Sequence, residues 1–339
     1  MGTAGWGLDC TLRNLCSKIF EHEGKVMFVK KLINYLTHPR KIVNYIDYRL
    51  LHSDCGKKVE NEKYIRRMFK NAMGYELDLE NPETFNEKLQ WLKLYDHNPE
   101  YVTMVDKYLS KAYVAERIGD EYVVPLYGVW DSFDDIDFDS LPEAFVLKTT
   151  HDCGGVVVCK DKSSFDKENA KKFLEKHLKR EYFYHCREWA YKHVKPRIIA
   201  EKFMKDSKDQ TEEGLTDYKF FCFDGEPKAM FIATDRAKEN VETKFDFFDM
   251  EFNHLPFTNG HPNADRKISK PENFELMIEL SKKLSQGIPH VRVDFYESEG
   301  KIYFGELTLF HWGGFVPFDP PEWDKTFGDW LSLPQKENI

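Results

Sequence analysis

Two carboxylates lie inside apolar segments near the C-terminus, in VRVDFYESEGKIYFGELT (291–308). Asp294 is in the first apolar run, Glu306 is at the end of the second, and the polar turn SEG separates them. Antiparallel strands joined by such a turn would place the two acids side by side. Adjacent carboxylates repel unless a cation lies between them, and Mg²⁺ often binds one or two carboxylates together with phosphate oxygens. The pair therefore predicts a magnesium–nucleotide site, while two solvent-facing acids on an ordinary hairpin remain the structural alternative.

A lysine and a glycine-rich turn offer a second phosphate-binding feature. Lys148 interrupts the apolar strand AFVLKTT (144–150), and Gly154 and Gly155 follow in the turn HDCGG. A glycine-rich turn lets backbone N–H groups approach phosphate oxygens, and a nearby lysine supplies charge. The segment does not match the P-loop pattern. A hairpin with a solvent-facing lysine is the alternative interpretation.

Two further strands carry charged residues with a spacing of two. Asp217 and Lys219 in DYKFF share one strand face, as do Arg292 and Asp294. An aspartate can accept from ribose hydroxyls and a lysine can reach phosphate, while an arginine can hold a γ-phosphate or a developing acyl-phosphate. Ion pairs that contribute little to stability are the alternative. Upstream, PRIIAEKFM (196–204) reads as an apolar strand whose end could present backbone groups to an adenine.

Composition limits the class of protein. The chain has 339 residues, 41% of them hydrophobic and 15% aromatic, which predicts one large or two to three small lobes. A net charge of −9 argues against nonspecific nucleic-acid binding. The seven scattered cysteines lack a CxxC pair and indicate reduced thiols in a cytoplasmic protein. No apolar run reaches the roughly 18 residues that span a bilayer.

The segment 25–52 is basic and amphipathic, and Pro39 separates its two helical halves. One interpretation is contact with an anionic membrane surface or a membrane enzyme, at the inner face of the membrane. The other is an ordinary helical hairpin packed on the core.

Helical patterns and apolar runs alternate along the rest of the chain. We expect helices at 81–96, where Thr84 and Glu87 form a capping box, at 105–119 with Gly119 as its stop, at 167–194 and at 270–288. We expect strands or hairpins at 121–130, 144–150, 154–161, 196–204, 216–236, 243–257 and 291–308. Hairpins mixed with helices favour α+β lobes over one parallel sheet.

The order of these motifs resembles the ATP-grasp superfamily and, more narrowly, the TupA-like ATP-grasp family of bacterial surface-polysaccharide biosynthesis, whose members are often labelled glycosyltransferases. The similarity covers roughly residues 80–334 and rests on NPETFNEKLQWLKLYD, DKYLSKAYV, FVLKTTHDCGG, IAEKFM, DYKFFCFDGEPK and VRVDFYESEGKIYFGELT. It implies an ATP-grasp fold of two α+β lobes gripping ATP, after an N-terminal helical region. The implied divisions are 1–80, 81–145 (substrate-side lobe), 146–205 (small lobe with the glycine-rich loop) and 206–339 (large lobe with the metal-binding hairpin).

The resemblance also implies site residues. ATP and Mg²⁺ are the expected cofactors, with Arg292 and Lys219 as catalytic residues. Expected ATP contacts are Lys107, Lys148, His151, Gly154, Gly155, Glu201, Lys202, Phe203, Met204, Asp217 and Lys219. Expected metal ligands are Asp294, Glu306 and Thr308.

The chain departs from the superfamily pattern at one metal ligand. Thr308 stands where the superfamily usually has Asn, and a hydroxyl holds Mg²⁺ less firmly than an amide oxygen, so a second metal ion is in question. Trp312, four residues on, is a candidate either for stacking on a sugar or for closing the core.

These features predict an ATP- and Mg²⁺-dependent ligase that joins a carboxylate to an amine through an acyl-phosphate. The resemblance suggests an amino acid or related group joined to a sugar of a bacterial capsular or cell-surface polysaccharide. A glycosyltransferase is the first alternative, and it would need an Asp-x-Asp site such as DFD at 137–139. A non-catalytic ATP-binding protein is the second.

Overall fold

The computed structural model describes residues 39–204, 216–235 and 241–335. The chain divides into two compact units, Met1–Val59 and Glu60–Ile339. In the first unit, α3 (Pro39–Leu51) and α4 (Asp54–Lys57) are described. Pro39 opens α3, where its missing N–H costs no helical hydrogen bond. Residues 25–38 of the basic segment lie outside the described residues, so its membrane contact stays a prediction.

Four helices begin the second unit: α5 (Asn61–Met73), α6 (Phe85–Tyr95), α7 (Glu100–Val105) and α8 (Leu109–Ile118). The predicted capping box is confirmed: Thr84 accepts from the Glu87 N–H, and the Glu87 carboxylate accepts from the Thr84 N–H at 3.0 Å. The expected helix at 105–119 is wrong at its start. The Asp106 carboxylate accepts from the N–H groups of Tyr108 and Leu109, so the helix begins only after it.

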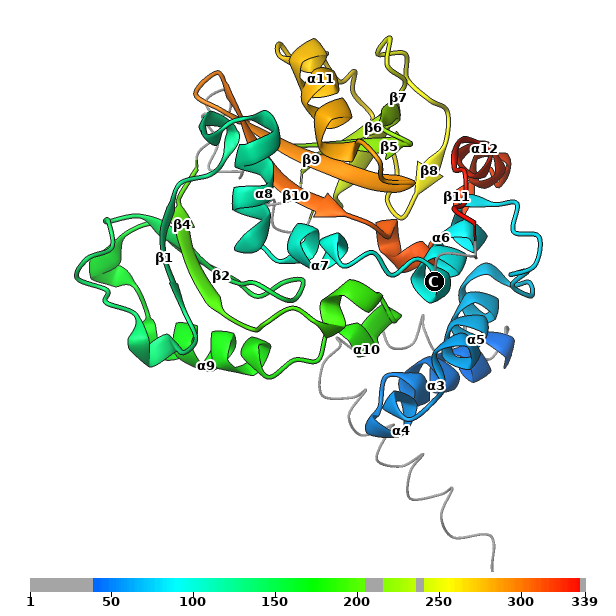
Figure 1. Ribbon diagram of the computed structural model, residues 1–339, viewed down its shortest axis with the longest axis horizontal. Helices are drawn as coiled ribbons and strands as arrows, with labels where there is room; N and C mark the ends of the chain where they lie inside the picture. Colours follow the sequence, from blue (N-terminus) through cyan, green and yellow to red (C-terminus); the bar gives the residue numbers. More distant parts are fainter. Residues whose placement is uncertain (1–38, 205–215, 236–240, 336–339) are drawn as a thin grey trace, which may run out of the picture. The chain divides into compact units, whose positions relative to one another are not determined.

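A four-stranded antiparallel sheet follows, with strand order β1 (Leu126–Trp130), β4 (Ile198–Lys202), β2 (Phe145–Thr149) and β3 (Val156–Cys159). The helix α9 (Lys167–Leu178) covers one face, where Leu174 joins Phe145 and Leu147 in a buried cluster (Figure 1). The expected long helix at 167–194 is broken into α9, α10 (Phe183–Cys186) and the 3-10 turn η4 (Trp189–Lys192). Arg187 has a φ of 59°, which ends α10.

The second sheet has five antiparallel strands in the order β10 (Lys301–Thr308), β9 (His290–Ser298), β5 (Asp217–Phe223), β6 (Glu226–Thr234) and β7 (Lys244–Phe248). The helix α11 (Phe274–Ser285) packs on β5, β6 and β9, visible at the top of Figure 1. Phe220, Phe274 and Phe295 form the aromatic part of that interface. The opposite face of the sheet is left for polar residues on β5, β9 and β10.

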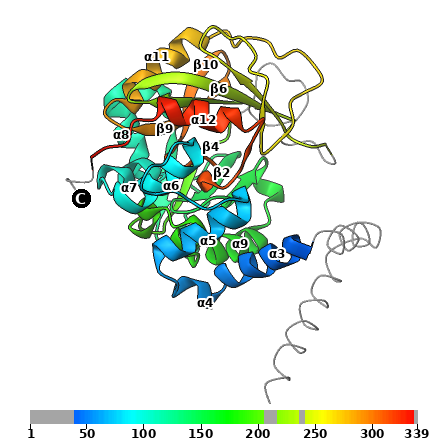
Figure 2. The same cartoon turned by 90° about the vertical axis from the view of Figure 1, so that its right-hand side faces the viewer.

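The expected hairpin at 243–257 is only partly present. After β7, the Asp249 carboxylate accepts from the N–H groups of Glu251 and Asn253, and this turn leaves only an isolated bridge, Phe248 to His254. The chain then forms β8 (Thr258–Asn259), which pairs with β11 (Phe318–Asp319). The helix α12 (Glu322–Trp330) packs against α6 (Figure 2). The remaining 3-10 turns are η1 (Asp120–Tyr122), η2 (Phe133–Asp135), η3 (Lys162–Ser164) and η5 (His311–Gly314).

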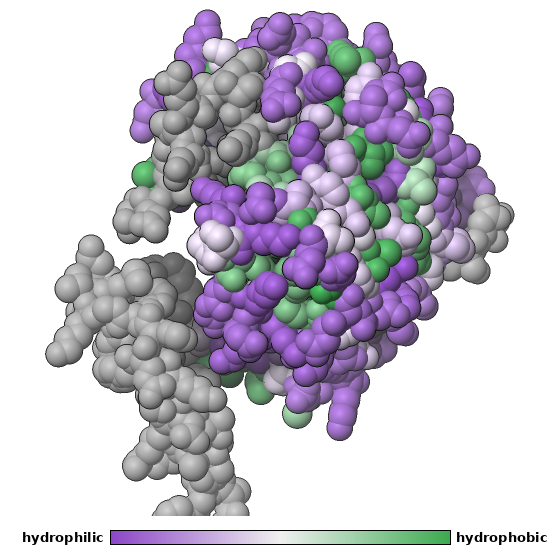
Figure 3. All heavy atoms as spheres, turned by 90° about the vertical axis from the view of Figure 1, so that its left-hand side faces the viewer, coloured by the Kyte–Doolittle hydropathy of each residue, from purple (hydrophilic) through white to green (hydrophobic). Residues whose placement is uncertain are grey.

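The fold is α+β, as predicted. Among the described helices, none combines the length and the apolar character needed to cross a bilayer. The face drawn in Figure 3 is mostly hydrophilic, with hydrophobic residues showing as separate patches, as is ordinary for surface exposed to water. The cysteines in the described ranges form no disulfide: Cys55, Cys153, Cys159, Cys186 and Cys222.

Candidate active site on the five-stranded sheet

The carboxylates of Asp294 and Glu306 belong to directly opposed residues. β9 and β10 pair antiparallel, and Asp294 lies opposite Glu306 in the register. A β-bulge between Phe304 and Glu306 produces this pairing, because Gly305 is an extra residue with no partner on β9. A Cβ at Gly305 would lie 3.0 Å from the Tyr296 ring and 3.1 Å from the Asp294 carbonyl oxygen. Glycine therefore suits this position better than any residue with a side chain.

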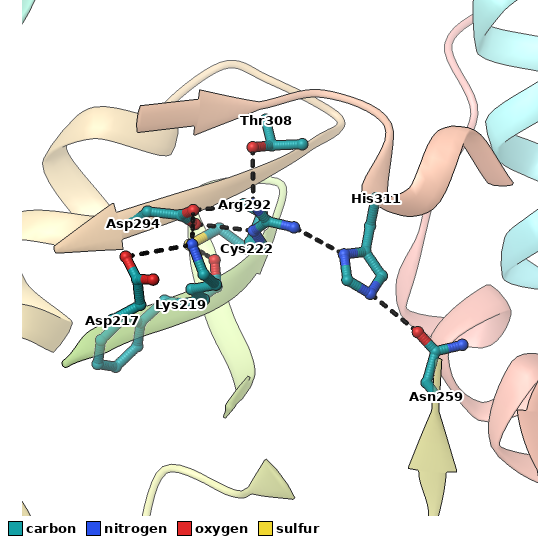
Figure 4. A network of polar contacts seen from close by, with 9 residues as sticks. Asp217, Lys219, Cys222, Asn259, Arg292, Asp294, Thr308 and His311 are labelled. Atoms are coloured by element: carbon teal, nitrogen blue, oxygen red, sulfur yellow. Dashed lines mark hydrogen bonds and ion pairs between the residues drawn. The ribbon is translucent and has the colours of Figure 1, made fainter. Parts of the chain in front are cut away.

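Cations surround the Asp294 carboxylate (Figure 4). The Arg292 guanidinium donates to both of its oxygens, at 2.7 and 2.8 Å, and the Lys219 ammonium donates to one of them. Lys219 also lies 3.5 Å from Asp217, as the shared strand face predicts. This network joins β5 to β9, and Glu306 is half-buried beside it.

The charges of this network are mutually stabilised. Burial alone would raise the pKa of Asp294, but Arg292 and Lys219 outweigh it and the pKa is lowered. Burial lowers the pKa of Lys219, with Asp294 opposing the shift. Burial also disfavours the charged form of Arg292, but Asp294 outweighs this effect and raises its pKa. The negative charge of Asp294 and the positive charges of Arg292 and Lys219 therefore stabilise one another in this buried network.

Arg292 is also held by Thr308 and by His311, and neither His311 nor its partner Asn259 was predicted from the sequence. Its guanidinium donates to the Thr308 hydroxyl at 3.0 Å and to His311 Nδ1 at 2.7 Å. Because guanidinium can only donate, Nδ1 accepts, and the protonated Nε2 donates to Asn259 Oδ1 at 2.9 Å. Burial lowers the pKa of His311 well below its ordinary value, so the ring is neutral. His311 directly precedes Trp312 in the sequence, whereas its partner Asn259 is 52 residues away.

The small sheet carries a second ion cluster. Lys148 on β2 lies 2.6 Å from the Glu201 carboxylate on β4, and Lys111 on α8 lies 2.7 Å from the same carboxylate. The two lysines outweigh the effect of burial and lower the pKa of Glu201. Lys111 was not predicted as a site residue, although it lies in the DKYLSKAYV motif. Val156 is the register partner of Lys148, and its 41% exposure leaves apolar surface beside the ion cluster.

The glycine-rich turn between β2 and β3 is a tightly bonded structure. Lys107 donates to the Asp152 carbonyl, and the buried His151 shares a hydrogen bond of 3.0 Å with the Arg180 carbonyl. A Cβ on Gly155 would lie 1.8 Å from Thr149 Oγ1, so only glycine fits there. Gly154 has a φ of 89°, which also favours glycine.

The end of β4 leads toward the large sheet. Met204 packs with Val124 and with Tyr303 of β10. The Lys202 N–H donates to the Pro125 carbonyl at 2.9 Å, so it is not available to an adenine. The adenine would have to form hydrogen bonds with other backbone groups of residues 202–204. Phe203 is half-buried. The structure thus brings the predicted residues together in three groups: the face with Asp217, Lys219, Arg292, Asp294, Glu306 and Thr308; the Lys148–Glu201 cluster with the strand end at 202–204; and Lys107 with the turn at 151–155.

The donor set suits one Mg²⁺ ion with phosphate. Glu306 forms no hydrogen bond or ion pair with any other described side chain, and Asp294 Oδ1 accepts only one donor. Two adjacent carboxylates match the small number of protein ligands that Mg²⁺ takes beside phosphate and water. Thr308 is already an acceptor for Arg292, so it is the weakest of the three expected ligands. Within the described ranges, no cluster of three His, Cys, Asp or Glu side chains could hold a metal by itself.

Trp312 is partly exposed, at 40%, with a φ of 52°. Its ring stacks on Phe245 and lies over Gly260, where a Cβ would come within 2.9 Å of it. Both earlier interpretations of Trp312 stay open, because the ring has a packed side and an exposed side.

A family model described as TupA-like ATPgrasp matches residues 87–332. No curated protein sequence matches. Among solved structures, D-alanine–D-alanine ligase from Bacillus anthracis in complex with ATP is 16% identical, with a TM-score of 0.40 over 74% of this chain and 82% of the other. The Helicobacter pylori enzyme is 17% identical, with a TM-score of 0.37 over 74% and 70%. L-amino acid ligase from Bacillus licheniformis is 11% identical, with a TM-score of 0.40 over 75% and 55%.

Proposed function

We propose a reaction for this chain, which belongs to the TupA-like ATPgrasp family: it joins a carboxylate to an amine through an acyl-phosphate. The chain is an ATP-dependent ligase, and its cofactors are ATP and Mg²⁺. The observation that carries the proposal is the pairing of Asp294 with Glu306 beside Arg292 and Lys219.

Some of these residues would bind the metal ion and the nucleotide, and others would neutralise the charge that develops during the reaction. Asp294 and Glu306 would hold Mg²⁺, which together with ATP supplies a transferable phosphoryl group. Lys148 and Lys107, with the turn at 151–155, would bind the nucleotide phosphates. Arg292 and Lys219 already lie against a carboxylate, and both can neutralise the charge that develops on the phosphoryl group and on the acyl acceptor.

Closure of the glycine-rich turn would protect the intermediate. An acyl-phosphate hydrolyses in water, so a ligase must exclude water while the amine attacks. Burial raises the pKa of the Cys153 thiol in this turn, and the Glu306 carboxylate of the metal-site hairpin adds to the shift.

The family resemblance suggests the acceptor. The proposed product carries an amino acid or related group on a sugar of a cell-surface polysaccharide. For the glycosyltransferase alternative, Asp137 and Asp139 lie in the loop between η2 and β2, and the Asp139 N–H donates to the Asp137 carboxylate. No observation favours that alternative.

Thermal shift with ATP, ADP, UDP, UDP-glucose and GDP-mannose, each with and without Mg²⁺, tests the proposal, since a ligand that binds the native state raises its stability. We expect a magnesium-dependent rise with ATP and ADP only. The variant Glu306→Gln should lose the rise, and Glu299→Gln, an exposed acid in the same hairpin, should keep it. A rise confined to UDP or a sugar nucleotide would overturn the ligase proposal.

A further inference from the structure

The glycine-rich turn contains an acid, although it is proposed to bind phosphate. Asp152 lies between His151 and Cys153, and its side chain is fully buried. A carboxylate that faced a bound phosphate would repel it, since both are negatively charged. Where the structure holds this carboxylate therefore decides whether the turn can bind a nucleotide.

The Asp152 carboxylate lies on the side of the small sheet that α9 covers. Lys148 and Thr149 are adjacent on β2, so their side chains are on opposite faces of the sheet. Leu147 shares the face of Thr149 and belongs to the buried cluster under α9, whereas Lys148 reaches Glu201 on the other face. Because Thr149 Oγ1 donates to Asp152 Oδ1, the carboxylate is on the face opposite Lys148.

The end of α9 binds the turn through two side chains. His177, in the last turn of the helix, donates through Nδ1 to Asp152 Oδ2 at 2.5 Å, since a carboxylate can only accept. Arg180 follows the helix, and its guanidinium lies 3.5 Å from the same oxygen and donates to the Cys153 carbonyl at 3.0 Å. The Arg180 carbonyl shares the hydrogen bond with His151. Three consecutive residues of the turn are thus bonded to α9 and to the residue that follows it.

These contacts also explain the second glycine of the turn. A Cβ on Gly155 would meet three polar atoms: Thr149 Oγ1 at 1.8 Å, Asp152 Oδ1 at 2.8 Å and His177 Nδ1 at 3.1 Å. Gly155 therefore packs over the junction between the turn and α9, and a side chain there would separate them. Gly154 has more space, because the nearest described atom outside its chain neighbours would lie 4.0 Å from its Cβ.

The turn retains the backbone donors that a phosphate needs. Among the described residues, no acceptor is bonded to the N–H groups of residues 151–155, whereas the N–H groups of Thr150 and Val156 on either side are bonded to carbonyl oxygens. Consecutive N–H groups of this kind form anion-binding sites in turns. An aspartate in a turn ordinarily accepts from an N–H two residues further on, so Asp152 would compete with phosphate if it were not held elsewhere.

We propose that His177 and Arg180 are positioning residues for nucleotide binding: they hold the Asp152 carboxylate away from the turn's N–H groups and leave these groups to the phosphates. This inference rests on the proposed function, because it assigns the turn to the nucleotide phosphates. Neither residue touches the nucleotide. Because the turn is fixed to α9, a closing movement would carry the turn and the helix together.

The test measures nucleotide affinity by calorimetric titration with Mg²⁺ and AMP, ADP or the β,γ-imido analogue of ATP. We expect His177→Leu to lose about 10-fold or more in affinity for ADP and for the ATP analogue, because the released Asp152 carboxylate competes with their phosphates. The affinity for AMP, which has fewer phosphates to lose contacts, should change by less than about 3-fold. The control Lys176→Leu, at an exposed residue of the same helix, should bind all three nucleotides as wild type does.

A second substitution separates competition by the acid from a general loss of structure. The double variant His177→Leu with Asp152→Ala lacks the carboxylate that His177 restrains. Its affinity for ADP should return to within about 3-fold of wild type, although it has lost one more contact between the turn and α9. A purely structural role of His177 predicts the opposite, because each lost contact would then weaken binding further.

The inference and the proposed function fail differently. An equal loss of affinity for AMP and ADP, no loss in His177→Leu, or a double variant as weak as His177→Leu would overturn the positioning role. Failure of wild type to bind ADP with Mg²⁺ would instead contradict the proposed function. If His177→Leu does not fold, Arg180→Ala provides the same comparison, because the Arg180 side chain is 43% exposed, and we expect a smaller loss of about 3-fold for ADP.

Discussion

Asp294 and Glu306 lie directly opposite each other on β9 and β10, and the unpaired Gly305 creates this register. Without the bulge, Gly305 would oppose Asp294, and Glu306 would oppose Val293 on the other face of the sheet. The two carboxylates share a face because one strand contains an extra residue at that point.

The two carboxylates should respond differently to removal of their charge. Glu306→Gln should abolish magnesium-dependent ADP binding with little change in stability, because Glu306 forms no ion pair with a described residue. Asp294→Asn should also lose this binding and should lower the free energy of unfolding by about 3 kcal/mol, since Lys219 and Arg292 lose their shared partner. Denaturant unfolding and thermal shift measure the two effects. Wild-type ADP binding in both variants would contradict the metal-site assignment.

The bulge can be tested by Gly305→Val. The new side chain would meet the Tyr296 ring and the Asp294 carbonyl, so β10 must shift and Glu306 must move away from Asp294. We expect the affinity for ADP with Mg²⁺ to fall by about 10-fold or more, as it does when a metal ligand or its support is displaced. Calorimetric titration measures it. Gly300→Ala, in the exposed turn of the same hairpin, is the control for a general loss of hairpin stability.

His311 is predicted to be a positioning residue for Arg292. His311→Phe removes the acceptor that fixes one guanidinium nitrogen, so kcat should fall by about 10-fold or more while the affinity for ADP with Mg²⁺ is kept. His311→Gln can restore an acceptor and should recover part of the loss. Steady-state kinetics of ADP release measures kcat. A change in KM for ATP with unchanged kcat would assign His311 to nucleotide binding instead.

Asp324 should make stability depend on pH. It accepts from the backbone and side-chain N–H groups of Asn86, at 2.9 Å each, but burial raises its pKa from 3.8 to about 6. A raised folded-state pKa means that its stabilising contribution is full below about pH 4 and is lost as pH rises through 6. The loss is about 3 kcal/mol.

The variant Asp324→Asn cannot ionise, so it isolates this effect. The free energy of unfolding of wild type minus that of Asp324→Asn should decrease by about 3 kcal/mol between pH 4 and pH 7. Urea unfolding at a series of pH values measures the difference. A difference that stays constant with pH would show that Asp324 titrates at an ordinary pKa in the folded protein.

Features encoded by neighbouring residues were predictable from the sequence alone. The Thr84–Glu87 capping box needs only residues three apart, and the hairpin at 291–308 follows from alternating apolar residues around a turn. The motif order from Lys148 to Glu306 was sufficient to indicate the family. Gly305, directly before Glu306, was the one local signal for the bulge, since glycine inside a strand often marks one.

Only the tertiary structure decided which distant groups become partners. Lys111 joins Lys148 at Glu201, and Asn259 orients His311 across 52 residues of sequence. The start of α8 was also mispredicted. The Asp106 carboxylate accepts from the N–H groups of Tyr108 and Leu109, so the helix begins only after Asp106. Periodicity records which face of an element is buried, whereas the partner of a buried charge is set by how strands register and elements pack, and no short stretch of sequence contains that information.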